Sequence, residues 1–357
     1  MIENNLSFSD KFSNVLRRMG FSKAGLILIA VVAVLPLIPP FNNEFLLRWL
    51  VMGAFLAAQA IAFDLTAGFI NVVNFGFAAI LGVGAYTSAI LTNTTPHIIV
   101  QSGINPWFGI FIGGFAAAFV GFILGFLTLR LRGLYAAIMS WFVGIALLGL
   151  ARTLTPLTRG SMGMNPQSLL ETSSNRPYFY IILIMMAVIY IITKLVTTSN
   201  MGLAFRALGS NFDAARASGI NPTTYRVFNF TLSCFFAGIL GGFYAHYFVS
   251  MTPKAIMHTS KAIEVLAIAY IGGRGFLWGG VLVAFPFVFF IEYLRSSLPN
   301  LPGLHIVIYG VLMILVMIFY PNGLAGLLTQ LKKRIEKSAE KRSASKKRGA
   351  ESSVQQE

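Results

Sequence analysis

Histidine, cysteine, serine and acidic side chains form most catalytic and metal-binding sites. Their spacing in this chain indicates neither a catalytic site nor a metal site. The four histidines are His97, His246, His258 and His305, and no two of them have the spacing of a zinc-binding pair. The single cysteine, Cys234, excludes a disulfide framework and any cysteine-based zinc or iron–sulfur site. No Gly-x-Ser-x-Gly motif occurs, and no two carboxylates lie within reach on one helix face. The sequence therefore predicts a protein that is not an enzyme.

The motif that would bind ATP is absent as well. No Gly-x-x-x-x-Gly-Lys-[Ser/Thr] sequence occurs in the chain, so it cannot hydrolyse ATP through a P-loop. We therefore predict no cofactor in this chain. If the protein pumps a solute, the energy must come from a partner.

Several polar residues lie in or beside long apolar segments, where polar groups are costly and often functional. Asp64 stands beside Thr66 and Gly68, so it is expected either to cap a helix N-terminus or to line a transport pathway. Asn71 and Asn74 lie three residues apart on one helix face, where they would hydrogen-bond neighbouring helices or face a cavity. Both interpretations predict that the two asparagines are buried.

The remaining polar candidates are two glutamates and a histidine. Glu264 and Glu292 are expected to face a water-filled cavity or to pair with Arg274 or Arg295. His246 is expected to be either a packing histidine whose hydrogen bonds are satisfied or an interfacial histidine in a belt of tyrosines. The candidates to line a pathway are Asp64, Asn71, Asn74 and Glu264.

The composition places these residues in a membrane protein. Of the 357 residues, 56% are hydrophobic and only 11% are charged, and the mean hydropathy is +0.73. The 34 glycines would let membrane helices approach closely. We predict an all-α, polytopic transmembrane helix bundle of about ten spans. The apolar runs cover residues 24–38, 45–63, 65–91, 106–129, 134–151, 178–196, 227–250, 261–272, 276–294 and 304–320.

Two of these runs are unlike simple membrane helices. The stretch DLTAGFINVVNFG, at the start of the run 65–91, carries Asp, Thr, Asn and Gly, and it predicts a broken or re-entrant helix. The run 261–272 contains Glu264 and is too short for a full crossing. We expect it to be a half-helix that ends at the Gly-Gly-Arg-Gly sequence 272–275.

The 27 lysines and arginines indicate the orientation. If the N-terminus is cytoplasmic and every run crosses the membrane, twenty of them lie inside and seven outside, as the positive-inside rule requires. Both termini are then cytoplasmic. Residues 1–23 form a cytoplasmic segment, 24–328 the transmembrane domain, and 329–357 a basic, disordered tail near anionic lipid. We therefore attribute the net charge of +15 to membrane topology and not to nucleic-acid binding.

The segment 197–226 is the longest cytoplasmic loop between spans, and its pattern is amphipathic. Leu203, Ala207 and Leu208 recur at helical spacing, with charged residues on the other faces. Gly219 is expected to end the helix and Pro222 to begin the next one. The segment is therefore either a helix lying in the headgroup layer or a short helix that docks into a groove of a cytosolic subunit.

Four strings of the sequence are informative together. They are GLYAAIMSWFVGIALLGL, GLAFRALGSNFDAARASGINPTTYRVFNFTLSCFFAGILGGFYAHYFVSMTP, IGGRGFLWGGVLVAF and IYGVLMILVMIFYPNGLAG. In this order they resemble the permease subunits of ABC importers for branched-chain amino acids, the M-type partner of the pair. The likeness extends from about Leu46 to Leu328, and DLTAGFINVVNFGFAAILGVGAY is similar to the first signature of that family.

The resemblance implies a role for the loop 197–226. In that family, the segment similar to RALGSNFDAARASGIN carries the coupling helix that is seated on the ATPase. The implied ATPase contacts are Arg206, Asp213, Ala214, Ala215, Gly219 and Ile220. Family members often have Gly-x-x-Ser-x-Gly-His after the Asp-x-x-x-Gly element, whereas this chain has Asn71, Asn74 and Phe77. This departure leaves the substrate open, because related permeases also serve urea and short amides.

The resemblance further implies an ATP-driven importer in the plasma (inner) membrane. This chain and a second, homologous permease would form the path for branched-chain or related amino acids. Two ATP-binding subunits would hold ATP and magnesium, and an extracytoplasmic binding protein would deliver the substrate. The alternative is an ion-coupled secondary transporter of a small polar solute. Such a transporter usually places carboxylates in mid-span, whereas Asp64, Glu264 and Glu292 are near the ends of runs.

Overall fold

The computed structural model describes residues 43–93, 102–131, 133–172, 174–297 and 304–319, together with 36, 323, 324 and 326. The predicted segments 1–23 and 329–357 lie outside this part of the chain. So does the first apolar run, 24–38, apart from residue 36.

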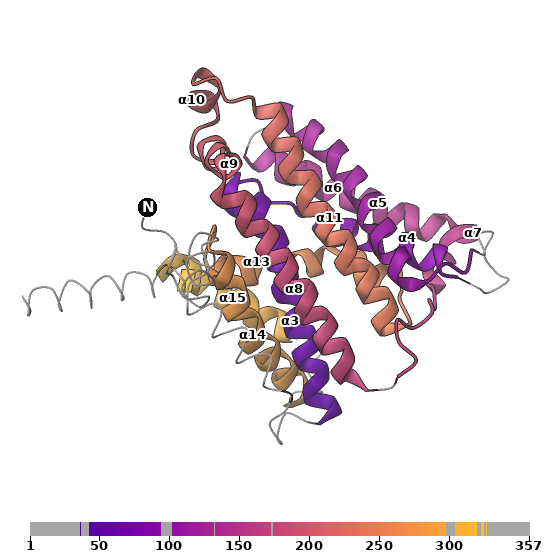
Figure 1. The fold of residues 1–357 in the computed structure, drawn as a ribbon. Coiled ribbons are helices and arrows are strands. Elements are labelled where there is room, and N and C mark those ends of the chain that lie inside the picture. Colours follow the sequence, from indigo (N-terminus) through magenta and orange to yellow (C-terminus); the bar gives the residue numbers. More distant parts are fainter. Residues whose placement is uncertain are drawn as a thin grey trace, which may run out of the picture.

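The described residues form a bundle of helices, and they include no β-strand (Figure 1). The longer helices are α3 (Glu44–Asp64), α4 (Phe77–Leu91), α5 (Pro106–Leu127), α6 (Leu134–Thr153), α8 (Asn175–Thr198), α11 (Pro222–Phe248), α13 (Thr259–Gly272), α14 (Leu277–Ser297) and α15 (Leu304–Phe319). The shorter helices are α7 (Thr155–Thr158), α9 (Asn200–Ser210), α10 (Phe212–Ala217) and α12 (Pro253–Met257). The predicted all-α class is confirmed.

The described residues contain fewer long apolar helices than the ten spans that the sequence pattern predicts. Within the described residues, 6 helices are long and apolar enough to cross a bilayer. They are Glu44–Phe69, Pro106–Arg130, Leu134–Thr153, Asn175–Thr198, Pro222–Phe248 and Leu277–Leu294. Helices α4, α13 and α15 have 15, 14 and 16 residues, fewer than the roughly 20 that a full crossing needs. The expected ten spans are therefore not confirmed, although each of these shorter helices coincides with a predicted apolar run.

Local sequence signals explain where many of the helices begin. The side chains of Asn43, Asn105, Ser174 and Asn221 each accept a hydrogen bond from a backbone N–H of the helix that follows. Proline occupies the first position of α5, α11 and α12, where its missing N–H costs nothing. Helix α13 ends at Gly272 and is capped by Gly273, which has a positive φ of 108°. The predicted end of the half-helix near 272–275 is confirmed.

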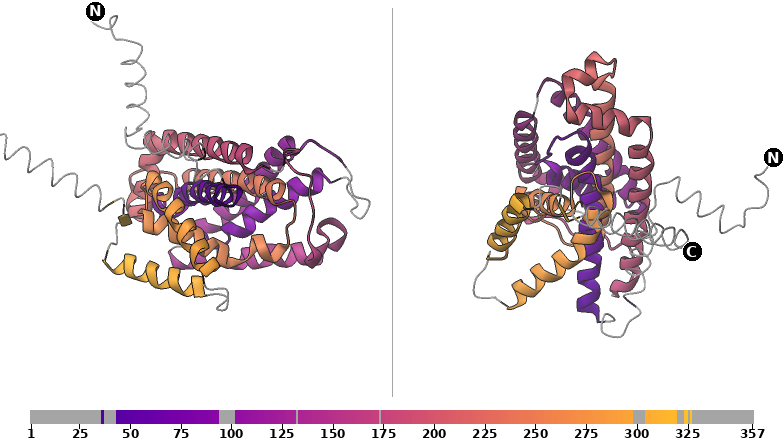
Figure 2. Two further views of the ribbon diagram at one scale, coloured as in Figure 1. Left: turned by 90° about the horizontal axis from the view of Figure 1, so that it is seen from below. Right: turned by 90° about the vertical axis from the view of Figure 1, so that its left-hand side faces the viewer.

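Contacts between helices define two ends of the bundle. At the first, which we call the Glu44 end, the carboxylate of Glu44 accepts hydrogen bonds from Ser174 and Asn175 at the start of α8. At the second, which we call the Asp64 end, the last residue of α3 lies beside Gly275. Helices α3 and α8 lie side by side between these ends (Figures 1 and 2).

Glycines bring α4, α5 and α11 into backbone contact. A Cβ atom on Gly84 of α4 would overlap the backbone of Gly238 in α11, and one on Gly113 of α5 would overlap the carbonyl of Gly84. On Gly121, an added Cβ would lie 2.5 Å from the Cβ of Cys234. Such small residues let membrane helices pack closely, and the buried cysteine fills the space that remains.

Replacement of Gly84 by valine is expected to destabilise the folded chain by about 3 kcal/mol or more, because the added atoms collide with backbone that cannot move aside. Gly149→Val is the matched control, since nothing lies within 4 Å of a Cβ at that helical position. Thermal unfolding followed by size-exclusion chromatography measures both variants. Equal stability of the two would refute the close packing of α4 on α11.

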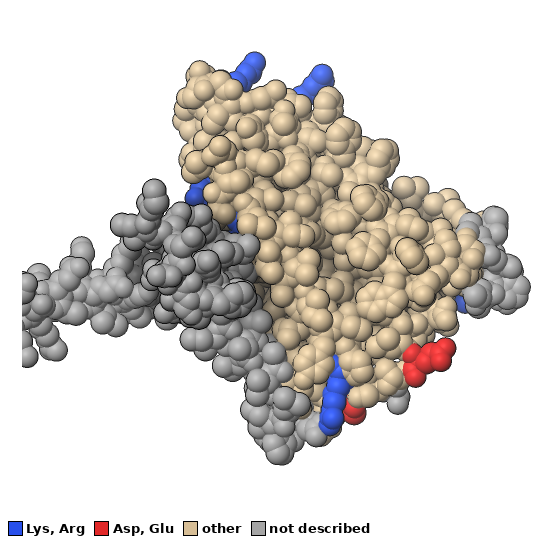
Figure 3. Space-filling view, in the orientation of Figure 1, with Lys and Arg blue, Asp and Glu red and all other residues tan. Residues whose placement is uncertain are grey.

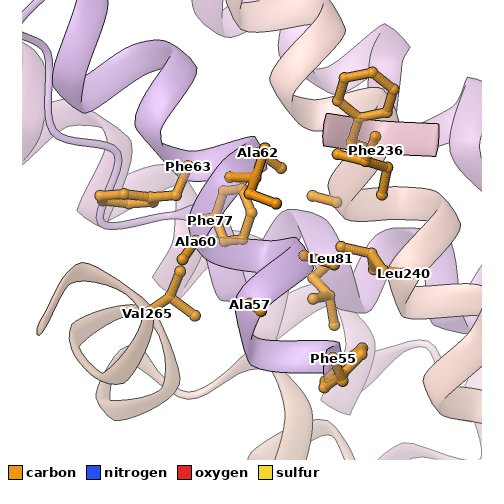
Figure 4. Packing of buried hydrophobic residues seen from close by; sticks show 14 of the residues in the cluster. Phe55, Ala57, Ala60, Ala62, Phe63, Phe77, Leu81, Phe236, Leu240 and Val265 are labelled. Atoms are coloured by element: carbon orange, nitrogen blue, oxygen red, sulfur yellow. The ribbon is translucent and has the colours of Figure 1, made fainter. Parts of the chain in front are cut away.

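Helix α3 lies in the middle of the apolar core. Figure 4 shows Phe55, Ala57 and Phe63 of this helix among side chains from α4, α11 and α13, including Phe77 and Val265. Phe63 and Phe77 meet edge to face with ring centroids 5.4 Å apart. By contrast, α15 lies at the edge of the bundle (Figure 2).

The face of the molecule seen in Figure 3 has a broad band of described residues without Lys, Arg, Asp or Glu. In that view, charged side chains gather near α10 and at the opposite, lower end. Large apolar side chains on α5 and α6 are exposed, among them Phe115 at 67%, Phe119 at 66% and Phe142 at 60%. This distribution is the one expected for helices that face lipid tails or other membrane helices.

Candidate functional site

The first candidate region is the break that follows α3. The chain leaves α3 at Asp64, makes a single π-helical turn over Leu65–Phe69, and has no regular secondary structure from residue 70 until α4 begins. Asn71 has a positive φ of 59°, a left-handed conformation that asparagine tolerates better than most residues. Non-helical backbone at such a place must be satisfied by neighbouring protein or water. The predicted break is therefore confirmed.

Two side chains of α11 satisfy the backbone at the end of α3. Asn229 donates from Nδ2 to the carbonyl of Leu65 at 2.9 Å, and Ser233 donates to the carbonyl of Ala62 at 2.6 Å. Both are fully buried. This role is not among the predictions from the sequence, although two polar residues four apart in an apolar run are a usable signal.

Asp64 holds the break to the turn between α13 and α14. Its carboxylate accepts the N–H of Gly275, with Oδ1 at 3.0 Å and Oδ2 at 3.1 Å, and the residue is only 4% exposed. The side chain makes no helix-capping hydrogen bond, so the capping interpretation was wrong. Gly68 has no room for a Cβ, which would overlap the Asp64 carboxylate.

The two asparagines of the break do not share a face. They lie outside any helix, and Asn71 has left-handed backbone, so the prediction from helical spacing was wrong. Asn71 is exposed, contrary to expectation, and its Oδ1 accepts from Arg274 at 3.4 Å. Asn74 is fully buried, and neither of its amide atoms has a hydrogen-bond partner among the described residues.

The loop 197–226 contacts this break directly. Arg206 of helix α9 makes a cation–π contact with the ring of Phe69, with 5.4 Å between the guanidinium carbon and the ring centroid. Gly209 packs so closely on the backbone of Phe69 and Ile70 that a Cβ there would overlap it. A cleft of about 320 Å³ lies between the loop, the break and the turn that carries Arg274.

Helix α10 ends as the sequence predicts. Gly219 has a φ of 84°, its N–H donates to the carbonyl of Arg216, and the N–H of Ile220 donates to the carbonyl of Ala215. This is the pattern of a glycine helix cap. Pro222 then begins α11. Both predictions for this segment are confirmed.

The implied ATPase contacts differ in exposure. Arg206, Asp213, Ala214 and Gly219 are exposed, and Ile220 is half-buried. Ala215 is buried, at 5% exposure, so its side chain packs against the chain itself and is not available to a partner. Leu203, in contrast, is an exposed apolar residue on α9 at 62%.

A buried arginine anchors α10, and sequence analysis missed it. Arg226 is 4% exposed, donates to the carbonyl of Thr128 at 3.0 Å, and lies 5.2 Å from the ring centroid of Phe212. This arginine therefore joins the start of α11 to the end of α5 and to α10. A basic residue at a predicted helix start was visible in the sequence, but its partners were not.

Glu264, the remaining candidate, lies far from the break along α13. It forms an ion pair with Lys261 at 2.8 Å. Glu264 and Glu292 line one cavity of about 130 Å³, as the cavity interpretation expected. The four candidates thus belong to two regions: Asp64, Asn71 and Asn74 lie at the break, and Glu264 lies at this cavity.

The packing interpretation of His246 is confirmed. His246 is fully buried, its Nε2 lies 2.8 Å from the hydroxyl of Ser88, and its Nδ1 lies 2.7 Å from the carbonyl of Gln167. Among the described residues, no three His, Cys, Asp or Glu side chains gather as they would around a metal ion.

Comparison with known proteins gives a consistent result. The family described as "Branched-chain amino acid transport system / permease component" matches residues 45–317. The chain is 27% identical over 290 residues to the high-affinity branched-chain amino acid transport system permease protein LivM of Escherichia coli (strain K12), covering 73% of this chain and 65% of that protein. LivM of Salmonella typhimurium (strain LT2) matches equally well over the same shares. The chain thus spans about two thirds of the length of these relatives.

More distant relatives match as well. LivH of Escherichia coli (strain K12), a permease protein of the same kind of system, is 22% identical over 294 residues, covering 77% of this chain and 92% of LivH. The nucleoside ABC transporter permease protein NupC of Lactococcus lactis is 25% identical over 197 residues, covering 49% of this chain and 59% of NupC. No solved structure matches the chain.

Proposed function

Because the chain belongs to the permease-component family of branched-chain amino acid transport systems, we propose that it is a membrane permease subunit of an ATP-driven importer. It would transport branched-chain or closely related amino acids. The observation that carries this proposal is the way in which the loop 197–226 is exposed at one end and packed against the bundle at the other. Its two short helices and the turn that follows them present exposed Arg206, Asp213 and Gly219 at one end of the bundle, and α9 packs on the break after α3.

The proposal gives the loop a mechanical role. An ATP-binding subunit that binds α10 and moves would also displace α9, because a single residue, Asn211, joins the two helices. Asn211 follows the last residue of α9, and its side chain caps α10 by accepting the N–H of Ala214. Helix α9 would pass that displacement to the π-helical turn and to Asp64. Displacements of packed helices of this kind can convert the domain motion of a partner subunit into the opening of a transport pathway.

The partners follow from the same assignment. E. coli K12 has two relatives of this chain, LivM and LivH, each a permease protein of a branched-chain amino acid system. We therefore propose a second, homologous permease beside this one, two ATP-binding subunits that supply ATP and magnesium, and an extracytoplasmic binding protein. We further propose that both termini and the loop are cytoplasmic, and the excess of inside charges that is counted when every predicted run crosses the membrane supports this orientation.

Purification from the native host tests the assembly, and reconstitution tests the activity. Mass spectrometry is expected to find two ATP-binding proteins and a second hydrophobic permease in stoichiometric amounts. Proteoliposomes that contain this complex are expected to take up leucine, isoleucine or valine only with ATP and the binding protein. A chain that purifies alone and restores uptake under an ion gradient without nucleotide would refute the proposal.

A further inference from the structure

A cavity of about 130 Å³ lies between six helices near the first turn of α13. Its lining comes from α3, α4, α11, α12, α13 and α14. Gln59, at 5% exposure, lies in its wall, whereas the Lys261 side chain is 51% exposed and lies at its rim. The cavity is therefore connected to the surface at its charged side.

Most of the wall is apolar. Phe55 and Leu56 of α3, Leu81 of α4, Ile256 of α12 and Ile291 of α14 face the space. An apolar protein cavity of about 150 Å³ holds a benzene molecule, so this volume accommodates the three or four carbons of a valine, leucine or isoleucine side chain. A site of this kind stabilises an apolar group by removing it from water.

The charged groups of the cavity have both signs. Lys261 and Glu264 pair at 2.8 Å, and Glu292 of α14 lines the same space. Charges this close to the apolar interior of a membrane helix bundle are costly, and they commonly mark the path of a solute. One ammonium group and two carboxylates are complementary to an amino-acid zwitterion, which carries one carboxylate and one ammonium group.

We propose that this cavity is a transient binding subsite for zwitterionic amino acids with branched apolar side chains. Lys261 binds the α-carboxylate, Glu264 and Glu292 bind the α-ammonium group, and the wall around Phe55 and Leu81 receives the side chain. The inference rests on the proposed transport function and names where the substrate stops on its way. The site need bind only weakly, because a substrate held tightly could not leave.

The test uses a thiol reporter at the cavity. Ala255 lines the cavity and is exposed, and the native Cys234 is fully buried. In the Ala255→Cys variant of the whole complex, reconstituted in nanodiscs without nucleotide or binding protein, the rate of maleimide labelling is measured with and without leucine. The parent complex without the new cysteine supplies the blank. Leucine is expected to slow the labelling severalfold, whereas leucinamide, which lacks the carboxylate, is not.

Lysine variants identify the groups involved. Lys261→Met is expected to abolish the protection by leucine, and Lys261→Arg, which keeps the charge, is expected to retain it. Lys254→Met is the matched control, because Lys254 is exposed beside the reporter and does not line the cavity. Each variant is compared by the ratio of labelling rates with and without leucine. The proposal is overturned if leucine does not protect the cysteine in the Ala255→Cys variant, or if it protects equally well after Lys261→Met is added. Protection by a nucleoside instead of leucine would also overturn it and would assign the cavity to another class of ligand.

Uptake measurements separate this inference from the proposed function. If the complex takes up leucine with ATP but leucine never protects the cysteine, the importer assignment stands and the subsite is refuted. If leucine protects the cysteine in the expected variants but no uptake of leucine occurs, the proposed function fails and the subsite stands.

Discussion

Replacement of Gly219 by valine is expected to reduce ATP-driven uptake about tenfold while leaving the bundle folded. The residue has a φ of 84°, and a β-branched side chain in left-handed backbone costs about 1–2 kcal/mol, which corresponds to about a tenfold shift in a population. Nothing lies within 4 Å of a Cβ at this position. The change therefore strains the end of α10 without disturbing any packing.

Gly219→Asn is the matched variant, because asparagine adopts left-handed backbone more readily than valine does. It is expected to keep at least about half of the uptake. Uptake per assembled complex and ATP hydrolysis stimulated by the loaded binding protein are measured together, with assembly checked by size-exclusion chromatography. Normal uptake by Gly219→Val would show that coupling does not depend on the conformation at the end of α10.

Features that depend on neighbouring residues in the sequence were predictable. The end of α10 at Gly219, the start of α11 at Pro222 and the break after Asp64 all agree with expectation, because turn residues and caps act within a few positions. The buried His246 was predictable for a related reason. A lone histidine in an apolar run is costly unless its neighbours satisfy it.

Features that depend on distant residues were not predictable. Asp64 and Gly275 are 211 positions apart, and no local pattern indicates that one binds the other. The burial of Ala215 depends on how α10 lies against the bundle. Asn71 and Asn74 were assigned to one face by helical spacing, but the break itself removes the helix on which that argument depends.

The span count shows a limit of hydropathy. Apolar composition indicates that a residue leaves water, but it does not distinguish a full crossing from a shorter helix packed inside the protein. Helix α4 illustrates this, because Phe77, Ala79 and Ile80 are buried by other helices over a length of only 15 residues. The same composition therefore gives two kinds of element, and only the structure separates them.

In the proposed importer, the contact between Asp64 and Gly275 would be the link through which the loop acts on the cavity. Arg206 and Gly209 of the loop pack on the π-helical turn that follows Asp64. Gly275 lies between α13 and α14, and those two helices carry Lys261, Glu264 and Glu292 of the cavity wall. A displacement at α9 thus has a continuous packed route to the charged side of the cavity.

Asp64→Ala is expected to lower uptake about tenfold or more, because it leaves the Gly275 N–H without its partner. An unpaired, partly buried hydrogen-bond donor costs about 1–3 kcal/mol. In this variant that cost weakens the contact between the end of α3 and the turn at Gly275. Gly68→Ala breaks the same link by a different route, since its Cβ would overlap the Asp64 carboxylate and lie 2.5 Å from the Gly275 nitrogen. Both variants are expected to keep ATP hydrolysis while losing uptake.

Asp64→Asn distinguishes the hydrogen bond from the charge. Asparagine keeps one oxygen that accepts the Gly275 N–H, so this variant is expected to retain most of the uptake. Initial uptake rates per assembled complex are compared for Asp64→Ala, Asp64→Asn and Gly68→Ala. A loss in Asp64→Asn as large as in Asp64→Ala would mean that the negative charge, and not the link to Gly275, is what transport requires. The route from α9 to the cavity would then have to pass through a different contact, such as the packing of α3 against α14.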